Sequence, residues 1–185
     1  MTEGLTQAVV DECVGNAHGN LARVRELVEL HPEVVDASAT WKETPIEAAT
    51  QMGDRPIIEL LVGRGAPVDF FTACVLGRED QVKAELTKKP ELATSCGVHE
   101  LPSLYFAAIG GNLQIAELLL AGGAGVNDRC EAAAPIHGAV MGRSPEMVRW
   151  LLERGADPDA KDYEGRSALR LARKMDQEDL AQIFE

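Results

Sequence analysis

The sequence predicts an all-α fold made of repeated helix–turn–helix units, and the clearest unit lies in residues 44–66. Thr44 has the side chain of a helix N-cap, and Pro45 suits the first helical turn, where its missing N–H is not needed. After a break at Gly53 a second helix follows, and Gly65 provides a left-handed C-terminal cap. The apolar stripe of this second helix consists of Ile57, Ile58, Leu60 and Leu61. A unit of this size cannot bury its apolar face alone, so it has to stack on similar units.

The same unit recurs along the chain. The position of Thr44 is taken in later units by Pro102, Ala134 and Ser167, and we call these four positions the anchors. The last three anchors follow one another at a nearly constant interval, and a fixed period of this kind is typical of a stacked helical solenoid. A Gly-Ala pair also returns at one fixed distance after the first three anchors, beginning at Gly65, Gly123 and Gly155.

The residues at the repeated positions resemble those of the ankyrin-repeat family. The resemblance is carried by Thr44-Pro45-Ile46-Glu47, Ala134-Pro135-Ile136-His137, Gly123-Ala124-Gly125-Val126-Asn127 and Gly155-Ala156-Asp157-Pro158-Asp159. It implies a solenoid of about six stacked helix–turn–helix units that forms a single domain over residues 1–185, with the first and last units acting as caps. The hairpin loops between such units are called fingers below.

The boundaries of these units follow from the anchors and the apolar periodicity. We expect the first helix pair at residues 4–16 and 20–30, and a third pair near 69–76 and 79–88. The complete units are expected at 44–66, 102–126 and 134–159, and a last unit with a polar second helix begins at Ser167.

A second, longer period relates Pro32-Glu33 to Pro90-Glu91 and Gly65-Ala66 to Gly123-Ala124. The first four units are therefore interpreted as two copies of a two-unit block. Val68 takes the next anchor position almost directly after Gly65-Ala66. Because this spacing leaves no room for a hairpin loop, we expect one finger to be missing near residue 68.

The composition limits the class of partner and the cellular location. A formal net charge of −12 argues against binding nucleic acid or an anionic membrane and weakly favours a basic partner. No stretch approaches the roughly 18 apolar residues of a membrane span, and the N-terminus lacks the pattern of a signal peptide. We expect a cytoplasmic protein, and a monomer, although self-association stays open.

The sequence shows no motif for catalysis, a cofactor or a metal. Cys13, Cys74, Cys96 and Cys130 are widely spaced and lack the pattern of zinc ligands, so we expect reduced, mostly packed thiols. Gly122–Gly125 follows a helix end, where glycine acts as a cap and not as a phosphate-binding loop.

The resemblance implies a structural role for His137, which lies at the position of the histidine in the family's Thr-Pro-Leu-His motif and would bond backbone between adjacent repeats. The equivalent positions are Glu47, Tyr105 and Arg170. Simple acid–base chemistry by Glu47, Tyr105 and His137, or binding of a small apolar molecule, is the alternative.

In ankyrin-repeat proteins the partner is usually bound by the fingers and by the exposed inner face of each first helix. Here the inner-face positions favour Met, Val, Leu and Ile, and adaptable apolar rows of this kind are typical of contact surfaces. The alternative is that Val75 and Leu76 belong to the core. Trp150 falls on a core stripe with Met147, Val148 and Leu151. The predicted partner-contacting residues are Trp41, Met52, Leu76, His99, Leu101, Tyr105, Ile109, Arg129, Met141, Tyr163 and Met175.

The main hypothesis is therefore a non-catalytic interaction module that binds a protein in its concave groove. A second hypothesis is the groove for a small apolar molecule or for acid–base chemistry. A third is a self-associating scaffold, in which exposed apolar faces pair between two chains.

Overall fold

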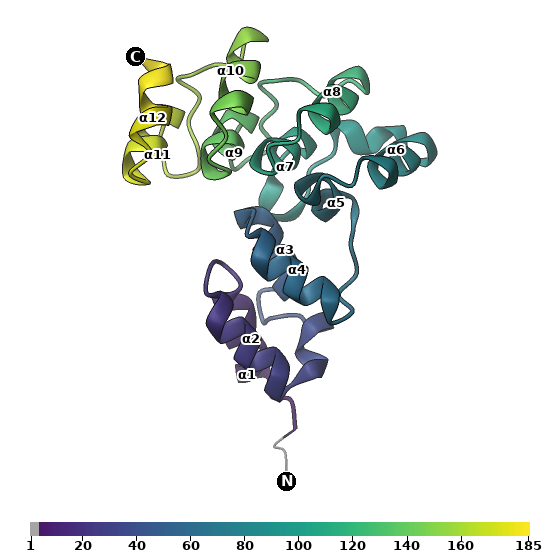
Figure 1. The fold of residues 1–185 in the computed structure, drawn as a ribbon. Helices are drawn as coiled ribbons and strands as arrows, with labels where there is room; N and C mark the ends of the chain where they lie inside the picture. The colour runs from purple at the N-terminus through teal and green to yellow at the C-terminus, as the bar shows by residue number, and fades with distance from the viewer. Residues whose placement is uncertain (1–3) are drawn as a thin grey trace. The chain divides into compact units, whose positions relative to one another are not determined.

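The computed structural model describes residues 4–185, and the described chain contains twelve α-helices and four short 3-10 helices (Figure 1). This confirms the predicted all-α repeat fold. The α-helices are α1 (Gln7–Asn16), α2 (Leu21–Leu30), α3 (Pro45–Met52), α4 (Arg55–Gly63), α5 (Phe70–Leu76), α6 (Glu79–Lys88), α7 (Ser103–Ile109), α8 (Leu113–Ala121), α9 (Pro135–Met141), α10 (Pro145–Glu153), α11 (Ala168–Lys174) and α12 (Glu178–Ala181). The 3-10 helices are η1 (Pro32–Asp36), η2 (Pro90–Thr94), η3 (Val98–Glu100) and η4 (Gln182–Phe184).

The helix starts follow from local capping. The hydroxyl oxygen of Thr44 accepts from the Glu47 N–H at 3.4 Å, and the Glu47 carboxylate accepts from the Thr44 N–H at 2.8 Å. This reciprocal pair is a capping box, with Pro45 at the first position of α3. α4 begins in the same way, because the Asp54 carboxylate accepts from the Ile57 N–H at 3.1 Å.

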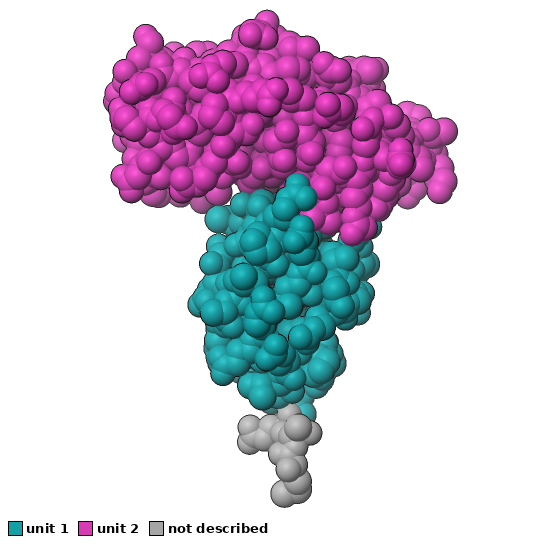
Figure 2. Space-filling view, in the orientation of Figure 1, with its two compact units in different colours: residues 1–72 teal, residues 73–185 magenta. Residues whose placement is uncertain are grey.

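The chain divides into two compact units, residues 1–72 and residues 73–185, and the division falls within α5 (Figure 2). In the first unit α1 packs on α3, and α2 packs on α4. In the second unit α9 packs between α7 and α11, while α6 packs on α8 and α10 on α12 (Figure 1). The first helices of the repeats thus form one layer of each unit and the second helices form another. A single domain over residues 1–185 stays a prediction.

The longer, two-unit period is visible in the backbone. η1 and η2 occupy equivalent positions and both follow a residue with the same unusual conformation, His31 with φ −134° and ψ 75° and Lys89 with φ −138° and ψ 78°. The missing finger is also confirmed, because only residues 64–69 separate α4 from α5. By contrast, residues 122–134 separate α8 from α9, and residues 154–167 separate α10 from α11.

The cores lie between the two helix layers. In the first unit Ile57, Ile58 and Leu61 of α4 are fully buried, as the apolar stripe of that helix predicts. Leu60, which also belongs to the predicted stripe, is only half-buried. In the second unit every residue of α7 is buried. Trp150 is 8% exposed and lies in the core layer with Met147, Val148 and Leu151, which confirms its structural interpretation. None of the helices in residues 4–185 has the length and hydrophobicity needed to span a bilayer.

Candidate functional site

In the first unit, Trp41 stands out on the surface of the finger that precedes α3. Its side chain is 49% exposed, and its indole N–H donates to the Glu43 carboxylate at 2.8 Å. The finger is closed by hydrogen bonds from the Ala39 N–H to the Glu43 carbonyl and from the Lys42 N–H to the Ala39 carbonyl, both 2.8 Å. Trp41 is therefore presented to solvent in a fixed position.

The Glu43 carboxylate that holds Trp41 belongs to a polar network. Glu43 is only 3% exposed, and its second carboxylate oxygen accepts from the Gln51 amide at 3.0 Å. The same amide nitrogen lies 2.7 Å from His18 Nε2, while His18 Nδ1 lies 3.1 Å from the Val14 carbonyl. His18 therefore joins this network through both of its ring nitrogens. Met52, next to Gln51, is half-buried.

In the second unit, Tyr163 is an exposed large hydrophobic side chain on the finger that precedes α11. It is 75% exposed, and its ring centroid lies 5.9 Å from the Arg166 guanidinium carbon. The finger is held by Asp162, whose carboxylate accepts from the Glu164 N–H and from the Arg166 N–H and Nε–H at 2.8–2.9 Å. Although burial acts in the opposite direction, these Arg166 hydrogen bonds hold the pKa of Asp162 below its usual value.

His137, in α9, contacts backbone atoms through both ring nitrogens. Its Nδ1 accepts from the Ala134 N–H at 3.3 Å, and its Nε2 lies 3.1 Å from the Arg166 carbonyl, at the start of the next repeat. Burial lowers the pKa of His137, although the Arg166 carbonyl and Asp162 act in the opposite direction. These contacts confirm the structural role that the resemblance implied.

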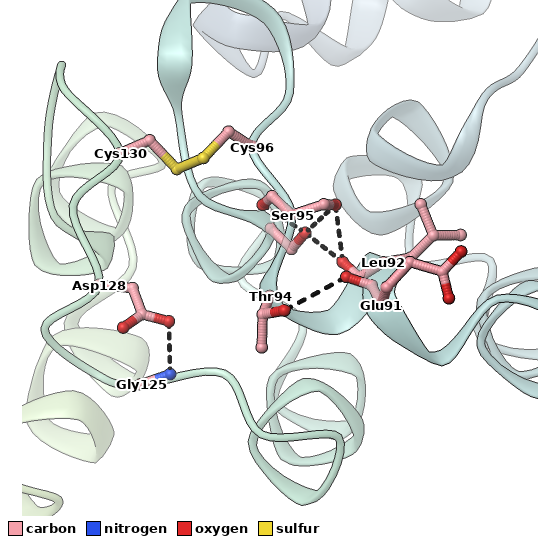
Figure 3. Close-up of a disulfide and its surroundings, with 9 residues drawn as sticks. Glu91, Leu92, Thr94, Ser95, Cys96, Gly125, Asp128 and Cys130 are labelled. Atoms are coloured by element: carbon pink, nitrogen blue, oxygen red, sulfur yellow. Dashed lines mark hydrogen bonds between the residues drawn. A yellow bond between two sulfur atoms is a disulfide. The ribbon is translucent and has the colours of Figure 1, made fainter.

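The prediction of four reduced thiols is wrong for two of the cysteines, because Cys96 and Cys130 form a disulfide (Figure 3). It joins two loops that we call the Cys96 finger (residues 95–102) and the Cys130 finger (residues 122–134). The sequence separation of 34 is close to one repeat period, so it places the two cysteines on adjacent fingers. This spacing is the signal that sequence reasoning missed. Cys13 and Cys74 are buried and take no part in a disulfide, as predicted.

The exposed ends of these two fingers include two of the predicted contact residues. His99 lies at the end of the Cys96 finger, and Arg129 precedes Cys130 in the Cys130 finger; both are exposed. The disulfide therefore fixes the position of one predicted contact residue relative to the other.

Three other predicted contact residues are in the core, which corrects the expectation that they face solvent. Leu101 and Tyr105 are each 5% exposed, and Ile109 is 4% exposed. For Tyr105 and Ile109 the cause is the close approach of α7 and α9: a Cβ on Gly142 would lie 2.1 Å from the Ile109 carbonyl oxygen, and one on Gly138 would lie 2.7 Å from the Tyr105 carbonyl oxygen. Helices this close together cover the surface between them.

The remaining inner-face residues are partly accessible. Leu76, Met141 and Met175 in the second unit are half-buried. Val75 is 1% exposed, so the alternative core assignment is correct for Val75 and does not extend fully to Leu76.

The three candidate acid–base residues are used by the fold. Glu47 completes the capping box of α3, and His137 bonds backbone. Tyr105 is buried, and burial raises the pKa of its hydroxyl far above the usual value. Within residues 4–185 no cluster of three or more His, Cys, Asp or Glu side chains is arranged to hold a metal ion.

Layers of short helices joined by loops that present aromatic and charged side chains define a helical repeat protein. A family model described as ankyrin repeats (3 copies) matches residues 70–162 and 104–184. The chain belongs to the ankyrin-repeat family.

Similar curated proteins differ widely in their names. A putative ankyrin repeat protein of Rickettsia felis is 28% identical over 152 residues, covering 77% of this chain and 57% of the relative. Protein phosphatase 1 regulatory subunit 27 of Homo sapiens is 38% identical over 82 residues, covering 43% of this chain and 51% of the relative. BCL-6 corepressor-like protein 1 of Homo sapiens is 32% identical over 143 residues, covering 76% of this chain and 8% of the relative. The chain thus spans a little over half the length of the first two relatives and a small part of the third.

Proposed function

We propose that this chain is a non-catalytic module that binds a protein partner through its fingers and the accessible ends of its first helices. Ankyrin repeats are generally protein–protein interaction modules. Two of the similar proteins are named as a regulatory subunit of a phosphatase and as a corepressor-like protein. In the first unit the proposed contact residues are Trp41 and Met52. In the second they are Leu76, His99, Arg129, Met141, Tyr163 and Met175.

One observation carries this proposal. Among the described residues the exposed large hydrophobic side chains are Leu30, Trp41 and Tyr163, and two of these three lie on fingers. Each of these two is held by its own finger, Trp41 through Glu43 and Tyr163 beside Arg166. Rigid aromatic side chains lose little conformational entropy on binding and are enriched at binding hot spots.

The charge of the chain limits the chemical class of partner that it can bind. A net charge of −12 favours a partner with a basic contact surface and disfavours nucleic acid and anionic membrane. We further propose that the chain acts in the cytoplasm and as a monomer. Light scattering at high protein concentration tests the monomer. A dimer in this measurement would contradict the monomer proposal and support the self-associating scaffold.

Mutation of the exposed aromatic residues tests the proposal. A partner is first identified by affinity capture from the source cell, purified, and measured by calorimetry. We expect Trp41→Ala or Tyr163→Ala to weaken binding by at least about tenfold, as loss of a hot-spot side chain does. Met141→Glu tests the end of α9 in the same assay.

Leu30→Ala is the matched control, because Leu30 is 58% exposed but belongs to the second helix α2 and not to a finger. It should leave the affinity unchanged. Unchanged affinity in all the finger and α9 variants, or a loss confined to Leu30→Ala, would show that binding occurs elsewhere.

A further inference from the structure

We propose that Cys96 and Cys130 form a thiol–disulfide switch that sets the order of the Cys96 finger. Cys96 is exposed and Cys130 is half-buried, so of the two linked residues Cys96 is the more accessible to an attacking thiol. Disulfides that are accessible to solvent are the labile ones, whereas buried structural disulfides resist reduction.

The end of the Cys96 finger is poorly supported by its own backbone. His99 has φ 55° and Glu100 has φ 51°, so two consecutive residues with a Cβ adopt the left-handed conformation. At the base, the Gly97 N–H donates to the Leu101 carbonyl at 2.8 Å, and the Ser103 N–H donates to the Ser95 carbonyl at 3.0 Å. The base is thus closed while the end is held in a disfavoured conformation.

Backbone hydrogen bonds between the two fingers converge on Glu100. The N–H groups of Glu131 and Ala132 donate to the same acceptor, the Glu100 carbonyl, at 3.1 and 3.3 Å. They therefore depend on Glu100 keeping its left-handed conformation. Because Cys130 directly precedes Glu131, we expect the disulfide to hold these donors opposite that acceptor.

The helices between the two cysteines do not need the disulfide. α7 and α8 lie between Cys96 and Cys130 in the sequence, and α7 is buried throughout against its neighbours. Reduction is thus expected to release the fingers and leave the helix layers intact.

The reductant is a dithiol. Its thiolate attacks the sulfur of Cys96, the exposed residue of the pair, forms a mixed disulfide and releases Cys130 as a thiolate, which takes up a proton. The second thiol of the reductant, as a thiolate, then attacks the reductant's own sulfur in the mixed disulfide. The reductant leaves as an intramolecular disulfide, and the released Cys96 thiolate is protonated. Two electrons pass from the dithiol to the protein, and one sulfur–sulfur bond breaks as another forms.

The consequence for binding rests on the proposed function, since the switch fixes His99 relative to Arg129. In a cytoplasmic setting, disulfides are usually transient or redox-sensing and seldom permanent structural links. An exposed, reducible bond between two contact fingers fits that pattern.

Amide hydrogen exchange tests the switch without a partner, so its failure is separate from failure of the proposed function. The samples are protein purified without reductant, the same protein treated with dithiothreitol, and a Cys96→Ser/Cys130→Ser variant. We expect reduction and the double substitution each to speed exchange at Gly97, Glu131 and Ala132 by at least tenfold. Core amides of α7 and α8 should change by less than twofold. Cys13→Ser, a buried free thiol, should respond to dithiothreitol as the unsubstituted protein does.

Three results would overturn the proposal. The first is a mass showing four free thiols in protein purified without reductant. The second is equal exchange at the three finger amides before and after reduction. The third is fast exchange throughout α7 and α8 after reduction, because the disulfide would then hold the whole unit and not a finger.

Discussion

At the scale of single residues, the polar partners of a side chain decide whether it serves the fold or is presented for contact. His137 has both ring nitrogens directed at backbone atoms and is 1% exposed. One face of the Tyr163 ring lies beside the Arg166 guanidinium, while three quarters of the residue's surface faces solvent. The same finger therefore contains a structural acceptor for His137, the Arg166 carbonyl, and a side chain available to a partner.

The burial of His137 makes stability depend on pH. Its pKa is lowered in the folded chain, so protons bind more tightly to the unfolded chain, where histidine titrates near about pH 6.5. The contribution of His137 to the free energy of unfolding is therefore fully present above that pH and is lost as the pH falls toward the folded pKa. Over this range the free energy of unfolding changes by at most about 1.4 kcal/mol per pH unit. The lowered pKa of Asp162 acts only in the acid range below about pH 4.

Urea denaturation at pH 7.5 and pH 5.5 measures this effect. His137→Gln should lose less stability between the two pH values than the unsubstituted protein loses, whatever its stability at pH 7.5. His99→Gln, at an exposed position, should keep the full pH dependence. Equal pH dependence in His137→Gln and the unsubstituted protein would remove His137 as the cause.

A second residue-scale prediction concerns the position in each repeat where the chain turns from a first helix into a second. Gly53 and Gly111 adopt φ 65° and 68° there, but Arg143 and Asp176 adopt φ 53° and 54°. This conformation costs a residue with a Cβ about 1–2 kcal/mol, and part of this is offset by the lower entropy of its unfolded chain. Arg143→Gly should raise the free energy of unfolding by about 0.5–1 kcal/mol.

Gly111→Ala is the control for that prediction. The nearest atom to its new Cβ would be Ser144 Oγ at 3.6 Å, an ordinary contact, so only the backbone conformation changes the energy. It should lower the free energy of unfolding by about 1 kcal/mol. A lower stability of Arg143→Gly in chemical denaturation would mean that the Arg143 side chain contributes more than its conformation costs.

At the scale of elements, close approach between first helices shapes the accessible surface. Gly142 follows the last residue of α9 and has φ −75°, a backbone conformation that any residue can adopt. The turn therefore does not require glycine, and the absence of a side chain here is explained by the close contact with α7. Because an added Cβ would meet the Ile109 carbonyl oxygen at 2.1 Å, backbone atoms would have to move. Gly142→Ala should lower the free energy of unfolding by about 3 kcal/mol or more, at the upper end of overpacking effects.

The control for the helix contact is Gly15→Ala, which places a Cβ inside α1 with nothing within 4 Å. It should raise the free energy of unfolding by about 0.5–1 kcal/mol through helix propensity. If Gly142→Ala is as stable as the unsubstituted protein, then α7 and α9 are not packed as closely as described.

The elements were predictable because their signals are local. Caps such as Thr44, the apolar stripe of α4 and the short 64–69 linker are all encoded within a few residues. The site was less predictable because its geometry is set between repeats. The burial of Ile109 depends on Gly142, one repeat later, and the disulfide depends on two fingers being adjacent. The Glu43 network that holds Trp41 joins His18 and Gln51, which no sequence motif links.

At the scale of the whole molecule, the repeats present fingers in series along the sequence and bury the helices behind them. The described fingers hold Trp41, His99, Arg129 and Tyr163, whereas the large apolar residues of the first helices are buried or half-buried. The central claim is that a partner contacts these fingers. It differs from the initial prediction of an open apolar groove, because Tyr105 and Ile109 are withdrawn into the core.

Hydrogen exchange of the complex tests this claim most directly, with the purified partner at saturating concentration. We predict that binding slows exchange in the fingers, within residues 37–44, 95–102, 122–134 and 154–167, and at the C-terminal ends of α3, α9 and α11. Slower exchange confined to the second helices α2, α4, α6, α8 and α10, with the fingers unchanged, would contradict the account.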